Sequence, residues 1–532
     1  MSAVGLACSL GFWPWAPNAF EARAQTVDPP RRSSSRALDW ATRAANALGG
    51  VDKLKSIETV EVGGLSVWHQ REQSERPEGP WFATFTDFTD VRNVRLDAVR
   101  RTARTRGFSS PDWMDSTNWS EPSTTFAAGG LGIRQANGTF SPGEIPWDVG
   151  ALPVALGPEH ALVAALDAAD LHAEPDAVID GYAHHVLAFT FAAARVRLFL
   201  NAPSFLPKAI DVVRARPYDV FWAPWGDVAR RVTFGLWTLE PEGVLYPRLW
   251  DFSTNQQPDG TIEITRVRFN PPVDRSTFDI PEADRQRLAA GRRLIADTPL
   301  GSQERPSHEL APGIVQVPGR WDIVEVKQDD GVVIIEGPLS SSYSVKVIDD
   351  AKQRFGGAPI KAVISTSDSW PHIGGLREYV ARAIPIYALD LNVPILRRLF
   401  AAKFESTPDA LAKRPHEPTL RVVAGRTVVG TGSNQLVIYP LRTPSGERQM
   451  MVYWPAHHLL YTSDLFTIRG KFIFLPLQVA EAVGAAGREQ LQVETAFGMH
   501  YDPLPWSTIV AGAAPPARAT DASDPPVRSV PH

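Results

Sequence analysis

Cysteine is almost absent from this chain. Cys8 is the only one among 532 residues, and it lies in an N-terminal segment that we expect to be removed. The mature chain would then contain no cysteine at all. Disulfides, thiolate catalysis and cysteine-ligated zinc are therefore excluded.

Long apolar runs and a strong excess of one charge are also missing. Apart from the first residues, no apolar run is long enough to cross a bilayer, so we expect no transmembrane span in the mature chain. The net charge is −5, which gives no basic footprint for a nucleic acid. Nucleic acid is therefore not an expected partner.

Both ends of the chain differ from the rest. Residues 1–24 are rich in apolar and small residues and end in ARA, a pattern typical of a cleaved signal segment. The segment lacks Lys and Arg before its apolar part, so a disordered tail is the alternative. We expect export to the periplasm, with a flexible linker at 25–36. The tail 512–532 is rich in Ala, Pro and Asp and is expected to be disordered.

The pattern of apolar residues changes in the second half. Residues 37–285 consist mostly of alternating strands with a few helices, which predicts a curved antiparallel sheet domain. A charged and polar connector follows at 286–311. In 312–511 strands alternate with helices, which is typical of a layered fold. We therefore expect an α+β protein with two domains.

The most informative stretch is VISTSDSWPHIGGL, residues 363–376. Its first residues are typical of the end of a buried strand, and polar residues and a Gly-Gly pair follow. Layered folds commonly present catalytic groups at the carboxyl end of a strand. His372 is the one strong metal ligand in this stretch, which therefore has the outline of an active site with most ligands missing.

The order of elements over 312–510 resembles the metallo-β-lactamase fold, an αββα sandwich. The opening hairpin of that family ends in an acidic residue and a glycine, which here are Glu336 and Gly337. The resemblance covers about 200 residues, an estimate tied to the order of elements. It implies that loops at one edge of the sandwich form the active site.

The central loop of the family reads Thr-His-x-His-x-Asp-His-x-Gly-Gly. This chain has Ser367 and Ser369 in place of the first two histidines and Pro371 in place of the aspartate. His372 is the one metal ligand of this motif that matches. The frame of the loop is kept, and most of its ligands are replaced.

Three later ligands of the family fall on Arg442, Asp464 and His500. Arg442, in PLRTPSG, takes the place of a turn histidine, and Asp464, in LLYTSDLF, matches the aspartate that bridges two metals. His500, in FGMHYDPLPW, matches the last histidine. The resemblance implies that one metal has lost its three ligands and that the other keeps His372, Asp464 and His500. Such a set can hold one zinc or iron ion with open positions.

Other residues would complete the pocket. Ser367 and Ser369 would line the vacated half, and Asp368 between them is a weak substitute ligand. Arg442 would hold an anionic group through its fixed charge, and we expect it to carry catalysis together with Asp464. The alternative is a site that binds no metal, in which Asp464 pairs with Arg442.

Residues 40–285 resemble the outer-membrane lipoprotein carrier type of domain, a curved antiparallel sheet wrapped on a helix. The resemblance rests on ALGGVDKLKSIETVEVGG, GVLYPRLWDFS and NPPVDRSTFDIPE. Aromatic residues are dense here, and a concave sheet lined by them can hold an acyl chain or another apolar ligand. The alternative is that these aromatics fill an ordinary core.

Two functions follow from this reading. The first is a diverged hydrolase of the metallo-β-lactamase superfamily that binds at most one metal ion and acts on a small or anionic substrate. The second is a non-catalytic envelope protein, in which the degenerate site binds an anion and the N-terminal domain binds an apolar or lipid ligand. Bound metal would distinguish the two.

Overall fold

The computed structural model describes most of the chain between residues 34 and 513. The described ranges are 34–72, 78–79, 81–95, 98–108, 119–128, 132–134, 140–141, 157–279, 281–290, 294–301, 304–469, 472–474 and 476–513. The signal segment expected at 1–24 lies outside them, as do most of the linker at 25–36 and of the tail at 512–532.

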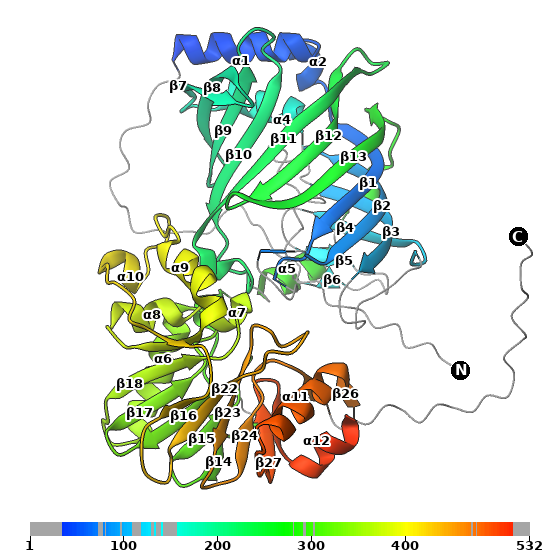
Figure 1. Ribbon diagram of the computed structural model, residues 1–532. Coiled ribbons are helices and arrows are strands. Elements are labelled where there is room, and N and C mark those ends of the chain that lie inside the picture. The colour runs from blue at the N-terminus through cyan, green and yellow to red at the C-terminus, as the bar shows by residue number, and fades with distance from the viewer. Residues whose placement is uncertain are drawn as a thin grey trace, which may run out of the picture.

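One large antiparallel sheet forms the N-terminal half (Figure 1). Its thirteen strands, within the described residues, lie in the order β6-β5-β4-β3-β2-β1-β13-β12-β11-β10-β9-β8-β7. The first strand along the chain, β1, pairs with the last, β13, and both lie in the interior of the sheet. The strands are β1 (Thr59–His69), β2 (Ala83–Asn93), β3 (Ala98–Phe108), β4 (Ser123–Ala128), β5 (Gly132–Arg134), β6 (Phe140–Ser141), β7 (His172–Ile179), β8 (Tyr182–Phe191), β9 (Ala194–Asn201), β10 (Pro207–Ala215), β11 (Asp227–Leu239), β12 (Leu245–Thr254) and β13 (Gln257–Phe269).

Helices pack on this sheet and share one apolar core with it. In the first helix, Ala37, Ala41, Ala44 and Leu48 are fully buried, at the spacing of one helix face. Gly49 ends the helix with a φ of 135°, a conformation that favours glycine. The helices are α1 (Ser35–Leu48), α2 (Val51–Lys55) and α4 (Pro158–Asp167).

The aromatic side chains of this half have two different locations. Phe88 and Trp250 are buried in the core beneath the helices, as in the alternative that assigned the aromatics to an ordinary core. Trp222 and Trp225 instead lie in the loop between β10 and β11, and both contact Trp370 of the C-terminal half. This loop includes the short helix η1 (Ala223–Trp225).

The C-terminal half contains two larger sheets and a small hairpin. The first sheet has the order β14 to β20, in which β17 to β20 are parallel. The second has the order β21-β22-β23-β24-β27-β28. The strands are β14 (His308–Ala311), β15 (Ile314–Val317), β16 (Ile323–Gln328), β17 (Gly331–Ile335), β18 (Ile360–Ser365), β19 (Ile386–Leu389), β20 (Leu420–Val423), β21 (Thr427–Val429), β22 (Leu436–Pro440), β23 (Met450–Trp454), β24 (Leu459–Tyr461), β25 (Thr467–Arg469), β26 (Phe472–Phe474), β27 (Thr495–Gly498) and β28 (Tyr501–Pro505).

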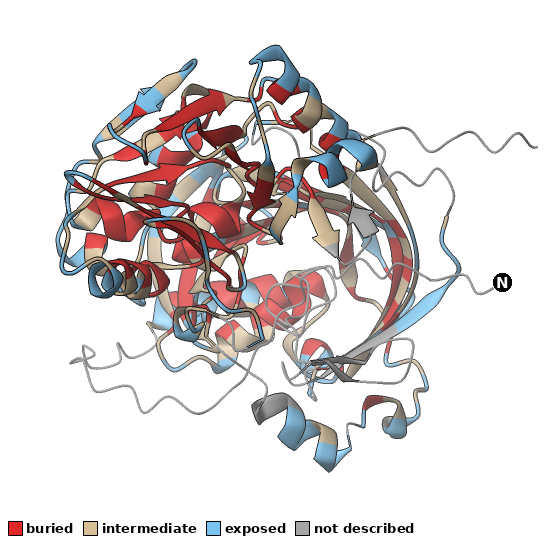
Figure 2. Ribbon diagram, turned by 90° about the horizontal axis from the view of Figure 1, so that it is seen from below, coloured by how far each residue is buried: buried red, intermediate tan, exposed pale blue. Residues whose placement is uncertain are grey.

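The alternation of apolar residues builds four layers from these elements. Ile334 of β17 points to a core shared with helices α6, α8 and α9, whereas Ile335 points to a core between the two sheets. On β22, Ile438 joins that central core and Val437 joins a third core under α11 and α12. Figure 2 shows the buried strands between these helices. The helices of this half are α6 (Ser341–Arg354), α7 (Trp370–Ile373), α8 (Leu376–Ala381), α9 (Val393–Ala401), α10 (Ala410–Lys413), α11 (Pro476–Arg488) and α12 (Trp506–Gly512), with η4 (Asp390–Asn392).

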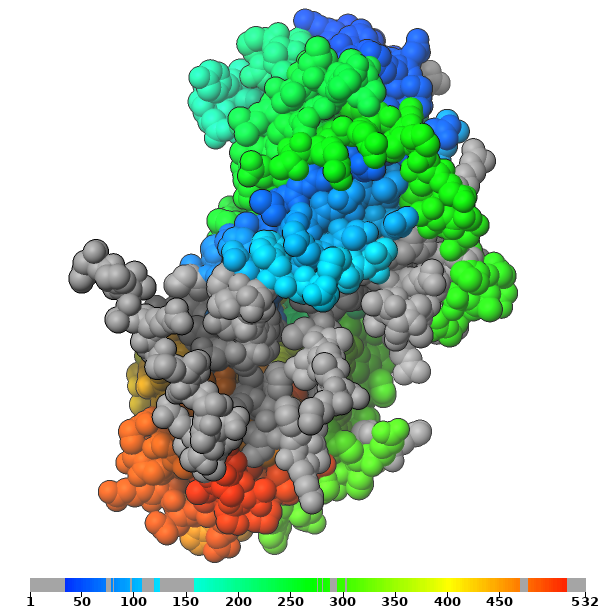
Figure 3. Space-filling model, turned by 90° about the vertical axis from the view of Figure 1, so that its right-hand side faces the viewer, coloured from blue at the N-terminus to red at the C-terminus, as the bar shows by residue number. Residues whose placement is uncertain are grey.

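The two halves are joined by more than a polar connector. The connecting segment contains α5 (Glu282–Ala290), η3 (Ile295–Asp297) and β14, and Ile295 is buried in the same core as Trp225. In Figure 3 the blue and green residues of the N-terminal half lie above the orange and red residues of the C-terminal half. The predicted α+β class, with a large antiparallel sheet, is confirmed. Every helix among the described residues is too short or too polar to cross a membrane.

Candidate metal centre

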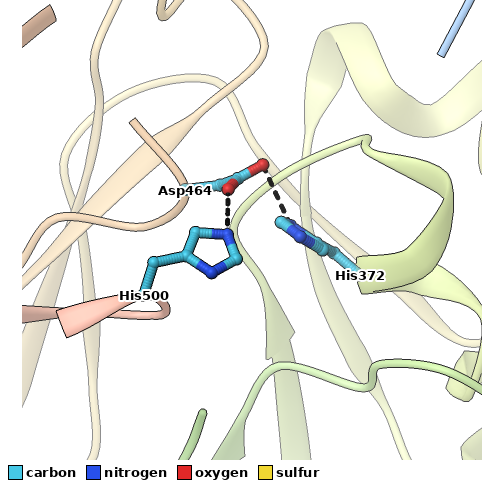
Figure 4. A group of neighbouring side chains, drawn as sticks. All are labelled: His372, Asp464 and His500. Atoms are coloured by element: carbon cyan, nitrogen blue, oxygen red, sulfur yellow. Dashed lines mark hydrogen bonds and ion pairs between the residues drawn. The ribbon is translucent and has the colours of Figure 1, made fainter. Parts of the chain in front are cut away.

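Three loops at one edge of the C-terminal layers bring His372, Asp464 and His500 together (Figure 4). His372 lies in α7, which follows the carboxyl end of β18, and Asp464 follows the carboxyl end of β24. His500 lies in the turn after β27, which runs parallel to β24. Because parallel strands end at the same edge of a sheet, Asp464 and His500 are neighbours by topology.

The ligand atoms of the three residues all lie within 4.8 Å of one another. Nε2 of His500 is 2.6 Å from Oδ1 of Asp464, at hydrogen-bond distance. Nδ1 of His372 is 3.2 Å from Oδ2 of the same carboxylate, but it is buried without a hydrogen bond. The two rings are 5.6 Å apart at their centroids.

Burial and charge act in opposite directions at this site. Burial lowers the pKa of the His372 imidazole to about 4, although the charge of Asp464 opposes this shift. Burial alone would raise the pKa of Asp464, but the charge of His372 and the hydrogen bond from His500 lower it below its usual value. At neutral pH the site therefore presents a neutral His372 beside a carboxylate, which are the protonation states that bind a metal.

A buried network ties two of the three loops together. The hydroxyl of Thr366 bonds to Oε1 of Glu336 and lies 2.7 Å from the hydroxyl of Ser463, next to Asp464. The hydroxyl of Tyr461 also donates to Oε1 of Glu336, at 3.3 Å. Burial raises the pKa of Glu336 to about 8, so this carboxyl is protonated at neutral pH. The network fixes the loop of Asp464 against the loop of His372.

The predicted pocket residues lie in the loop between β18 and α7. Ser367 is buried, and its hydroxyl accepts a hydrogen bond from the backbone N–H of Ser369 at 3.1 Å. Asp368 is partly buried, and burial raises its pKa to about 7 against the opposing charge of Arg448. Among the described residues, the group that could hold a metal consists of His372, Asp464 and His500 and does not include Asp368.

Arg442 lies apart from the interactions of these three residues. Its guanidinium donates to Oδ1 of Asp390 at 2.7 Å and to the carbonyl of Ala424 at 3.4 Å. Asp464 is paired with the two histidines, so the expected alternative pairing of Asp464 with Arg442 is not seen. The charge of Arg442 is therefore partly used by Asp390, at the end of β19.

Sequence reasoning missed the contribution of the N-terminal half. Glu72, just after β1, accepts a hydrogen bond of 2.7 Å from the hydroxyl of Ser369. Glu78 pairs with Arg448 at 2.7 Å. Neither glutamate belongs to a recognisable motif, and each is about 300 residues or more from its partner. No local signal in the sequence points to such contacts.

No protein-family model and no curated protein sequence matches this chain. Among solved structures, a metallo-β-lactamase from Pontibacter korlensis is similar over 39% of this chain and 96% of its own, at 14% identity and a TM-score of 0.31. A metallo-β-lactamase from Hirschia baltica matches at 16% identity and a TM-score of 0.30, over 39% of this chain and 97% of its own. The sec-alkylsulfatase Pisa1 from Pseudomonas sp. matches at 13% identity and a TM-score of 0.30, over 39% of this chain and 41% of its own. Similarities this low assign no activity.

The described residues fit a single metal ion. Two histidines and one carboxylate are a donor set suited to zinc or non-haem iron, with positions left open for water or substrate. The buried Nδ1 of His372 has no hydrogen-bond partner, although a buried polar atom normally has one. A metal ion would satisfy it.

Proposed function

We propose that this protein is a diverged hydrolase of the metallo-β-lactamase superfamily that binds one zinc or iron ion. The observation that carries the proposal is the convergence of His372, Asp464 and His500, from three separate loops, with a buried unbonded nitrogen on His372. The four layers of the C-terminal half and the position of the site at their edge also support it.

The three side chains would bind the ion, and the ion would supply Lewis acidity and lower the pKa of a bound water. His500 holds one oxygen of Asp464 at 2.6 Å, which orients the other oxygen towards His372. The ring of Trp321 lies edge-on to His372, with centroids 5.9 Å apart, and covers one side of that ligand. These residues would keep the ligand geometry fixed and exclude bulk water.

A small or anionic molecule is the proposed substrate. Arg442 is the proposed contact for an anionic group, since its side chain is 37% exposed and its pairing with Asp390 leaves other N–H groups for a ligand. Ser367, Asp368 and Ser369 are the proposed polar lining. We also propose that the protein acts in the periplasm, after removal of residues 1–24.

Chelation tests the proposal. Purified protein would be assayed against chromogenic sulfate, phosphate and carboxylate esters and a β-lactam, then dialysed with a chelator and reloaded with zinc or iron. We expect hydrolysis of at least one substrate to disappear on chelation and to return with the metal. Activity that survives complete metal removal would contradict a metal-dependent hydrolase.

A second candidate is a non-catalytic envelope protein that binds an anion at the same edge and an apolar ligand in the N-terminal half. It is favoured by the hydrogen bond of 2.6 Å between His500 and Oδ1 of Asp464, which holds one carboxylate oxygen without an ion. Binding of sulfate by metal-free protein, and its loss in Arg442→Ala, would support this candidate. Wild-type protein that retains no metal and hydrolyses none of the substrates would also favour it.

A further inference from the structure

We propose that loops of the N-terminal half position the metal ligand His372, with Glu72 as a positioning residue that acts through Ser369. The proposal rests on the proposed metal site only for its metal-binding readout. The effect of Glu72 on the loop between β18 and α7 can be tested without any ion.

Ser369 connects the two halves of the molecule at this point. Its hydroxyl donates to Oε1 of Glu72 at 2.7 Å, and its backbone carbonyl accepts from the N–H of His372 at 2.9 Å and from that of Ile373 at 3.2 Å. One residue therefore joins a carboxylate of the N-terminal half to the backbone turn that carries the histidine. A displacement of Ser369 would displace His372.

The next residue in the loop is held by the same half. The ring of Trp370 lies edge-on to Trp222 at 4.9 Å and to Trp225 at 5.1 Å, measured between centroids. The guanidinium of Arg71, next to Glu72, lies 5.6 Å from the Trp370 ring. Two consecutive loop residues thus contact the N-terminal half, one through a hydrogen bond and one through packing.

The N-terminal half also packs closely against the backbone that follows His372 in the chain. A Cβ atom placed on Gly374 would lie 2.9 Å from Cγ of Pro224, in the same N-terminal loop as Trp222 and Trp225. The N-terminal half therefore approaches the histidine from both sides along the chain. Helix α7 has only four residues, too few to be stable alone, so contacts from outside the helix are needed to position His372. The N-terminal half supplies part of them, beside the N–H of Leu339, which donates to the carbonyl of Pro371 at 2.6 Å.

The contact to Glu72 is a side-chain hydrogen bond between the two halves. The positioning role needs an acceptor oxygen at this point and does not need the charge. Glu72→Gln keeps an acceptor oxygen, whereas Glu72→Ala removes it, and this difference separates positioning from an electrostatic effect.

Hydrogen exchange of the loop amides is the first test. We expect Glu72→Ala and Ser369→Ala each to speed exchange in a peptide covering residues 369–373 by about tenfold, which corresponds to about 1.4 kcal/mol. The double variant should be no faster than Glu72→Ala, because that change already removes the hydrogen bond to Ser369. Glu72→Gln should remain close to wild type. If Glu72→Ala fails to fold, Ser369→Ala removes the same bond from the other partner.

The matched control is Arg195→Ala. Arg195 pairs with Glu405 across the same two halves at 3.0 Å, but both side chains are about 60% exposed. We expect this variant to exchange like wild type over 369–373. Equal acceleration in Arg195→Ala and Glu72→Ala would mean that any weakening of the interface loosens the loop, and would overturn the specific role of Glu72.

Cobalt binding is the second readout. Co²⁺ titrated into metal-free full-length protein reports affinity and ligand geometry through its visible absorption. We expect about three- to tenfold weaker binding in Glu72→Ala and Ser369→Ala, and near wild-type binding in Glu72→Gln and Arg195→Ala. Wild-type exchange and cobalt affinity in Glu72→Ala would overturn the proposal. If wild-type protein binds no Co²⁺, the proposed metal function fails, and the exchange experiment still decides the positioning.

Discussion

His372 faces Asp464 across 3.2 Å without forming a hydrogen bond. The other oxygen of the same carboxylate is held by His500 at 2.6 Å. One histidine thus orients the carboxylate, and the other is buried, neutral and unbonded beside it. In an ion pair, His372 would be protonated and would donate a hydrogen bond to Asp464. A neutral imidazole nitrogen is instead a metal ligand, so a metal ion would bind His372 in the state seen here.

The stability of the metal-free protein should fall as the pH drops from about 6.5 to about 4. Burial lowers the pKa of His372 from 6.5 to about 4, so the unfolded chain binds its proton first and acidification favours unfolding. The stabilisation is complete above pH 6.5 and amounts to roughly 3 kcal/mol, taking about 1.4 kcal/mol for each pKa unit. Denaturant unfolding of wild type and His372→Gln across this range measures it. Parallel pH profiles for the two proteins would contradict the burial of a neutral imidazole.

Glu336 should produce the opposite dependence at higher pH. Burial raises its pKa to about 8 in the folded protein, so its contribution is complete below pH 4.5 and is lost as the pH rises towards 8. Glu336→Gln keeps an oxygen that accepts from Thr366 and Tyr461 and carries no titrating proton. We expect this variant to lose less stability than wild type between pH 5 and 8, by on the order of a few kcal/mol. An unchanged slope would show that Glu336 is ionised when folded.

The sequence indicated the residues of the candidate metal site, but it did not indicate the contacts that neighbouring residues such as Arg442 make. The strand ends before Ser367 and Asp464 are marked by apolar runs that stop at polar residues. The expectation that His372, Asp464 and His500 lie near one another came from the resemblance to the metallo-β-lactamase fold. Arg442 was expected in the vacated half of the pocket, but its bond to Asp390 depends on how the loop after β22 lies beside η4. A contact of that kind has no local sequence signature.

Trp370 should be important for the stability of the whole chain. It is 8% exposed and lies between Trp222 and Trp225, at the contact of the two halves. Trp370→Ala should destabilise the protein by about 3–5 kcal/mol, the usual cost of removing a large buried aromatic side chain. Trp222→Ala should cost less, because Trp222 is only partly buried. Calorimetry measures both, and a cost below about 1 kcal/mol for Trp370→Ala would show that the contact contributes little.

The contacts around Trp370 also show why the joint between the two halves was hard to foresee. A polar segment at 286–311 predicted a simple connector, and this prediction took no account of the loop between β10 and β11. That loop places Val220 and Trp225 in a core that also contains Val228 of β11, Ile295 and residues of the first C-terminal sheet and its helices. The sequence marks these residues as apolar, but apolar residues in a loop do not reveal which surface they will cover.

Metal content measured per chain tests the central claim most directly. Wild type, His372→Ala and the pocket control Ser367→Ala would be stripped with a chelator, reloaded with zinc or with iron, freed of excess ion and analysed by mass spectrometry. We expect about one ion per chain in wild type and in Ser367→Ala, and none in His372→Ala, because the loss of one of three ligands leaves too few. Wild type without bound ion, or His372→Ala with as much as wild type, would contradict a metal site built from His372, Asp464 and His500.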